Sequence, residues 1–225
     1  MTFGTDQAIV FAAATMGGVR EGIDFFPLSV EYEERLYAGG KIPGSFFRRE
    51  GRPPPNAILT ARLTDRPMRP LFQRWHAQRS AGDRCSRISA DGVNPLDILA
   101  INAASAAIMI SDIPWSGPVA AVRVGRVDGE FVINPTFAEM DASDLDLRTG
   151  RHSKDAILMV ECGADEIPED VMVAALELGH KSIQPLDRPA TANGRLKSAS
   201  RSAKWHSSCP ATRSTRKSST ASAAR

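Results

Sequence analysis

The sequence is poor in the residues that build metal centres and disulfide frameworks. Its 225 residues include only three cysteines and four histidines. Cys85, Cys162 and Cys209 lie far apart, and no histidine has another histidine or a cysteine at metal-ligand spacing. Zinc sites and small disulfide-stabilised domains need such pairs. Both classes are therefore excluded, and we predict no metal ligand and no catalytic residue from spacing.

Long hydrophobic runs are also missing. No apolar stretch approaches the roughly 20 residues that span a bilayer as a helix. Residues Met1 to Asp6 show no basic region followed by an apolar one, which a secretory signal would require. We therefore expect a cytoplasmic protein without a membrane partner.

Excess positive charge is confined to one end of the chain. The formal net charge is +2, yet residues 186–225 hold nine lysines and arginines and one acid. The rest is mildly acidic, so overall charge gives no argument for nucleic-acid binding. The end segment is rich in serine, threonine and alanine and has too few apolar residues to bury a core. We expect residues 185–225 to be a disordered basic tail.

The preceding residues, 5–184, alternate between strand and helix patterns, which predicts an α+β domain. Expected strands lie at Gln7–Thr15, Asp24–Glu31, 120–127, 130–134, 145–147 and 156–161. Expected helices begin at a capping Asn56, at a capping Asn94 followed by Pro95, and at Ile167, the last ending near Ile183. Leu96–Ile110 is apolar nearly all round, so this helix should pack between other elements.

Two stretches interrupt these patterns. Gln73–Ile88 has neither a strand nor a helix period and predicts no regular element. Leu147–Lys154 is a milder case. We treat the histidines and cysteines within them as chemically uninformative.

The stretch Gly44–Arg52 is the strongest candidate for a binding site. Phe46 and Phe47 precede Arg48 and Arg49, with glycines on both sides. Aromatic rings can stack on unpaired bases while guanidinium groups hold the phosphates between them. A loop whose rings fill the core and whose arginines are solvated is the alternative. Taken alone, the spacing slightly favours that alternative.

The next helix adds a second basic feature. Arg62, Arg66 and Arg69 lie at i, i+4 and i+7, so they share one face, and Asp65 is a ready partner for any of them. Pro67 should bend or end the helix near Asp65. An ordinary charged face is the commoner use of such spacing. Three arginines just after an Arg-Arg pair instead favour a phosphate-binding patch, and single-stranded RNA as the ligand.

Three stretches that cover most of residues 20–183 resemble bacterial polyribonucleotide nucleotidyltransferase (polynucleotide phosphorylase). They read REGIDFFPLSVEYEERLYAGGKIPGSFFRREGRPPPNAILTARLTDRPMRPLF, NPLDILAINAASAAIMISDIPWSGPVAAVRVGRVDGEFVINPTFAEMDASDLDL and KDAILMVECGADEIPEDVMVAALELGHKSI. The resemblance is to the first of that enzyme's two RNase PH-like cores. It implies a phosphorolytic 3′→5′ exoribonuclease in mRNA degradation, with inorganic phosphate as substrate and Mg²⁺ as cofactor.

The resemblance also implies a ring-shaped homotrimer with RNA in a central pore. Phe46, Phe47, Arg48 and Arg49 carry over as RNA contacts that line this pore, and Arg62, Arg66 and Arg69 as basic residues directed at RNA or phosphate. The resemblance implies that the phosphate site and the metal-binding carboxylates belong to a second core, which we expect this chain to lack. The first strands of the first core are also expected to be missing.

Where Gln73–Ile88 stands, the family has an apolar strand, and where 185–225 stands, a helical linker. In both stretches arginine, serine and cysteine appear suddenly, and after Ile88 the family pattern resumes. This suggests local shifts of the reading frame, and Leu147–Lys154 is a third candidate for such a shift. An intact frame on resequencing the coding DNA would remove this hypothesis. Three interpretations stay open: a truncated enzyme that is inactive alone, a non-catalytic RNA-binding module, and a decayed product without a stable fold.

Overall fold

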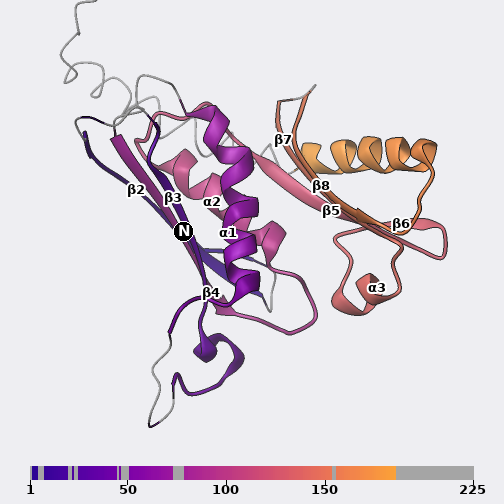
Figure 1. The fold of residues 1–225 in the computed structure, drawn as a ribbon, viewed down its shortest axis with the longest axis horizontal. Helices are drawn as coiled ribbons and strands as arrows, with labels where there is room; N and C mark the ends of the chain where they lie inside the picture. Colours follow the sequence, from indigo (N-terminus) through magenta and orange to yellow (C-terminus); the bar gives the residue numbers. More distant parts are fainter. Residues whose placement is uncertain are drawn as a thin grey trace, which may run out of the picture.

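The computed structural model describes residues 2–4, 8–19, 22, 25–44, 46, 51–72, 79–153 and 156–185. These residues form two four-stranded sheets and the helices that pack on them (Figure 1). The α+β fold expected from the sequence is confirmed. The tail expected at 185–225 lies, apart from its first residue, outside the described residues.

The first sheet has the strand order β1-β2-β4-β3. Its strands are β1 (Thr2–Gly4), β2 (Ile9–Val19), β3 (Leu28–Glu34) and β4 (Arg79–Ser89). Strand β4 runs antiparallel to β2 and parallel to β3. Helices α1 (Pro55–Met68) and α2 (Asp97–Ile110) lie on the same side of this sheet (Figure 1).

The second sheet is antiparallel throughout and has the order β6-β5-β7-β8. Its strands are β5 (Ala120–Val127), β6 (Glu130–Ile133), β7 (Leu145–Ser153) and β8 (Ala156–Ala164). The short helix α3 (Phe137–Asp141) joins β6 to β7. A last helix, residues 169–185, packs Ala175 and Ile183 against Val122 and Val124 of β5.

Helix α2 lies between the two sheets, which explains why it is apolar on every side. Ala100 and Ala104 pack in the cluster of the first sheet, whereas Ile98 and Ile101 pack with Val119 at the start of the second. The small alanine side chains on one side of α2 let the helix pack close to the first sheet. The prediction of a core helix here is confirmed.

The predicted hairpin is also confirmed. Asp128 and Gly129, which connect β5 to β6, have φ values of 51° and 84°. Two consecutive positive φ values are what a two-residue hairpin turn of the primed type requires, and Asp-Gly supplies them at low cost.

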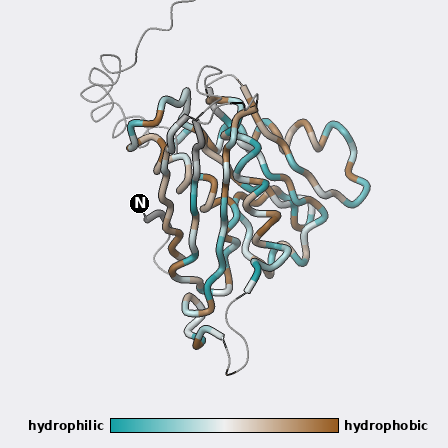
Figure 2. Tube along the Cα trace, turned by 60° about the vertical axis from the view of Figure 1, so that its left-hand side comes forward, coloured by the Kyte–Doolittle hydropathy of each residue, from teal (hydrophilic) through white to brown (hydrophobic). Residues whose placement is uncertain are grey.

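Strand β4 corrects the expectation that Gln73–Ile88 forms no regular element, and β7 runs through the second interrupted stretch. Asp83 of β4 lies beside Ala14 of β2 and Val30 of β3 and is only 3% exposed. Arg151 of β7 is 1% exposed. Backbone pairing with the neighbouring strands therefore places charged side chains at interior positions, and the strands of the first sheet mix hydrophilic with hydrophobic residues (Figure 2).

The helix boundaries differ in detail from those expected. Pro54 is the N-cap of α1 and Leu96 that of α2, so neither Asn56 nor Asn94 is a cap. The Asn94 amide instead binds Asp91 Oδ2. Pro67 does not end α1, which continues to Met68 before a 3₁₀ turn at Arg69–Leu71.

No helix in the described ranges is long and apolar enough to cross a membrane.

Candidate functional site

The loop that precedes α1 presents its first aromatic ring to solvent. Phe46 is 95% exposed, and Ile42 nearby is 88% exposed. Phe47, Arg48 and Arg49 lie outside the described residues. The alternative in which Phe46 fills the core is therefore wrong, and the part played by the other three residues stays a prediction.

The three arginines of α1 do not form one open patch. Arg69 donates to both carboxylate oxygens of Asp65, at 2.9 and 2.8 Å, and to the backbone carbonyls of Phe26 and Leu28 at 3.1 Å. The two bonds to the carbonyls fasten the end of the helix to the start of β3, and the two bonds to Asp65 hold the guanidinium in place. The expected partnership with Asp65 is confirmed, but it occupies the guanidinium that we assigned to RNA or phosphate.

Arg66 is also engaged, by partners from the second sheet. Its guanidinium donates to Glu161 Oε2 at 2.6 Å and to the carbonyl of Val160 at 3.2 Å, which links α1 to β8. Within the described part of the chain, Arg62 is neither hydrogen-bonded nor ion-paired. Of the three arginines, Arg62 alone keeps an uncommitted guanidinium there.

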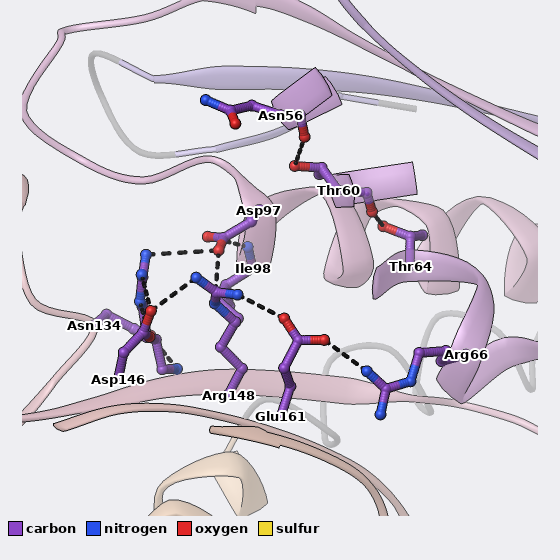
Figure 3. A network of polar contacts seen from close by, with 11 residues as sticks. Asn56, Thr60, Thr64, Arg66, Asp97, Ile98, Asn134, Asp146, Arg148 and Glu161 are labelled. Carbon is purple, nitrogen blue, oxygen red and sulfur yellow. Dashed lines mark hydrogen bonds and ion pairs between the residues drawn. The ribbon is translucent and has the colours of Figure 1, made fainter. Parts of the chain in front are cut away.

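A network of ion pairs continues from Arg66 into the interface between α2 and the second sheet. Arg148 of β7 donates to Glu161 at 2.8 Å and to Asp146 at 2.8 Å, and lies 3.2 Å from Asp97 at the start of α2 (Figure 3). Arg123 of β5 donates to both oxygens of Asp146, at 2.7 and 2.6 Å. Three arginines thus balance three carboxylates.

Burial strengthens the attraction between the charges of this network. The side chains of Arg123 and Asp97 are 10% and 14% exposed. Burial by itself would lower the pKa of Arg123, but the hydrogen bond to Asp146 and the charge of Asp97 raise it. The arginine therefore stays charged, and its carboxylate partners have a permanent counter-ion.

The sequence analysis missed this network. Its members come from five elements, and Arg66 and Glu161 are 95 residues apart. The one available signal was the alternation of Asp146 and Arg148 on β7, which places both side chains on one face.

A cavity of about 510 Å³ borders the network, whose residues form part of its lining. Its walls come from β3, α1, the start of α2 and α3, and Arg123, Arg148 and Glu161 form part of its lining. Arg62 lines this cavity and also a second groove, of about 720 Å³, between α1 and β3. Leu59 and Phe137 supply exposed apolar surface to the first cavity.

No group of three His, Cys, Asp or Glu side chains that could hold a metal ion occurs among the residues that the structure describes. Asp141, Asp144 and Asp146 lie close together in the sequence after α3 begins, but two of them have separate partners, since Asp144 binds Arg126 and Asp146 binds Arg123. These residues therefore do not fit a divalent cation site.

The comparisons with known proteins agree with this architecture. The family profile described as "3' exoribonuclease family, domain 1" (RNase PH) matches residues 2–114, and the profile for domain 2 of the same family matches residues 117–182. The chain is 54% identical over 180 residues to polyribonucleotide nucleotidyltransferase of Thermus thermophilus and 50% identical over 177 residues to that of Nostoc punctiforme.

These matches cover 80% and 79% of this chain but 25% and 24% of the relatives, so the chain spans about a quarter of the length of the curated relatives it matches. The crystal structure of rice (Oryza sativa) Rrp46 is similar in fold, with a TM-score of 0.69 and 15% identity over 85% of this chain and 86% of that one. The chain belongs to the 3′ exoribonuclease family of RNase PH.

Proposed function

We propose that this chain is the first RNase PH-like core of a polyribonucleotide nucleotidyltransferase, a phosphorolytic 3′→5′ exoribonuclease of mRNA degradation. The observation that carries the proposal is the match of both family domains, in order, along residues 2–182. Identity of about half to the bacterial relatives supports it. The cytoplasm as its location and a homotrimer as its assembly are part of the same proposal.

In the proposed reaction, an oxygen of inorganic phosphate attacks the phosphorus of the terminal phosphodiester. The bond from that phosphorus to the 3′ oxygen of the preceding nucleotide breaks, a nucleoside diphosphate leaves, and the 3′ oxygen takes up a proton. Mg²⁺ in such reactions neutralises charge on the transferring group. Because the described residues do not fit a metal site, we assign the metal and the chemical step to a core outside this chain.

This chain would contribute RNA binding. Phe46 is exposed where a base can stack, and Arg48, Arg49 and Arg62 are the cations proposed to meet the phosphates. Arg66 and Arg69 act instead as positioning residues, because their guanidinium groups fasten α1 to β8 and β3.

A chimera tests the proposal directly. Residues 1–184 of this chain replace the matched segment of the Thermus thermophilus relative. We expect phosphate-dependent release of ADP from poly(A) by the chimera. We expect no release by the chain alone, because no group of side chains that could hold a metal occurs among the residues that the structure describes. A folded chimera that binds RNA but releases no ADP, or ADP release by the chain alone, would contradict the proposal.

A non-catalytic RNA-binding module is the second candidate. It is favoured by the network, in which Arg123 neutralises Asp146 and Arg148 neutralises Glu161. It predicts RNA binding by the chain together with an inactive, folded chimera. Loss of a cooperative thermal transition would instead favour a decayed product.

A further inference from the structure

The cavity beside α1 has the volume of a small-molecule site. Its volume of about 510 Å³ lies within the range of roughly 300–1,000 Å³ that is typical of ligand pockets. It is walled by α1 on one side and by the start of α2 and α3 on the other. A mononucleotide fits such a volume.

The charges around this cavity leave one cation uncompensated. Arg66, Arg123 and Arg148 are balanced by Asp97, Asp146 and Glu161. Glu34, which also lines the cavity, lies 3.6 Å from Arg87. Arg62 has no partner in the described residues. An uncommitted guanidinium at the wall of a cavity is a binding group for a phosphate, because its planar fork matches two phosphate oxygens.

The same cavity has an apolar wall that the protein leaves open. Phe137 is 48% exposed and Leu59 is 59% exposed, and both line the cavity. An exposed aromatic ring offers a face on which a nucleobase can stack, and every base has a π-face that suits it. The polar groups of Asn56 and Thr60 on the same wall are within the lining.

We infer that this cavity is a nucleotide subsite, in which a base stacks on Phe137 beside Leu59 and its phosphate binds Arg62. The inference rests on the proposed function, because it extends RNA binding from the Phe46 loop to the inner side of α1. A free phosphate would leave the apolar wall uncovered, and an apolar ligand would leave Arg62 unpaired. A nucleotide satisfies both groups at once.

The test is equilibrium binding of a fluorescent adenosine 5′-monophosphate to the whole chain. We expect saturable binding that weakens about tenfold in Arg62→Ala and in Phe137→Ala, because each variant removes one of the two contacts. Phe137→Tyr should keep the affinity, because it keeps the ring. Lys41→Ala and Phe25→Ala are matched controls, since both residues are exposed and lie outside the cavity lining.

Binding of single-stranded RNA is measured on the same samples, after a thermal melt confirms that each variant is folded. RNA binding without nucleotide binding, or nucleotide binding that is equal in all variants, would overturn the inference and leave the proposed function standing. Inorganic phosphate that competes as strongly as the nucleotide would also overturn it. Nucleotide binding without RNA binding would support the subsite and contradict the proposed function, and failure of both would remove both.

Discussion

Raising the pH from 5 to 8 is expected to lower the folding equilibrium constant by roughly a hundredfold, or about 2.7 kcal/mol, through a single residue. Asp83 is 3% exposed, and no side chain in the described part of the chain hydrogen-bonds to its carboxylate; the adjacent backbone N–H of Arg84 lowers its pKa by less than burial raises it. Burial raises the pKa of Asp83 from 3.8 to about 7. The folded state therefore keeps a proton that the unfolded state releases near pH 4. The resulting stability is complete below that pH and is lost as the pH rises to about 7.

Urea unfolding at pH 5, 6, 7 and 8 measures this effect. Asp83→Asn cannot ionise and should remove most of the pH dependence. Asp112→Asn, a change at an exposed acid, should leave the dependence as in the wild type. Asp83→Val should gain stability at pH 8, because Ala14 and Val30 flank the position. Equal pH profiles for the wild type and Asp83→Asn would refute the effect.

Arg123→Met is expected to destabilise the fold by roughly 1–3 kcal/mol at neutral pH, because it removes two charge-assisted hydrogen bonds and leaves Asp146 and Asp97 to share Arg148 as their counter-ion. Arg123 binds both oxygens of Asp146 and lies 3.5 Å from Asp97. Methionine keeps much of the buried volume, so the loss reports charge more than packing. Chemical denaturation of the variant gives the free energy of unfolding.

Two further variants test whether the loss of stability comes from the buried charges of the network. Arg84→Met breaks an ion pair with Glu31 whose side chains are 62% and 52% exposed, so it should cost less than about 1 kcal/mol. Adding Asp146→Asn to Arg123→Met should cost less than the sum of the single changes, since it restores the balance between arginines and carboxylates in the network. An Arg123→Met variant as stable as Arg84→Met would show that the network contributes nothing.

Local chemistry was enough to predict several elements. The Asp128–Gly129 turn specified the β5–β6 hairpin, and the apolar run of α2 specified a helix buried between layers. In both cases the residues themselves favour one backbone conformation or one environment. The exposed position of Phe46 could not be predicted in this way, because the spacing alone slightly favoured rings that fill the core.

Strand β4 could not be predicted in this way. Its residues Arg79–Ser89 include Asp83, Arg84 and Arg87 and follow no strand period. Hydrogen bonding to β2 on one side and β3 on the other forms the strand, whatever the side chains favour. Charged residues at interior positions are also what a shifted reading frame would produce, so resequencing of the coding DNA remains the test of that hypothesis.

The arginines at positions 62, 66 and 69 show what sequence spacing cannot predict at the site. Positions i, i+4 and i+7 placed Arg62, Arg66 and Arg69 on one face, but spacing says nothing about partners from distant strands. Arg66 forms an ion pair with Glu161 of β8. Arg69 forms an ion pair with Asp65 and donates a hydrogen bond to the start of β3. Only the three-dimensional fold distinguishes the guanidinium that remains for a ligand.

Binding of a labelled single-stranded oligo(A) at low salt tests the central claim most directly. The tail 186–225 carries most of the basic excess, so the measurement is made on the whole chain and on a variant that ends at residue 185. We predict that the shortened chain still binds, and that replacing both Arg48 and Arg49 by alanine weakens this binding about tenfold or more, because phosphate contacts dominate the affinity. Binding that disappears with the tail and does not respond to the two arginines would contradict the account.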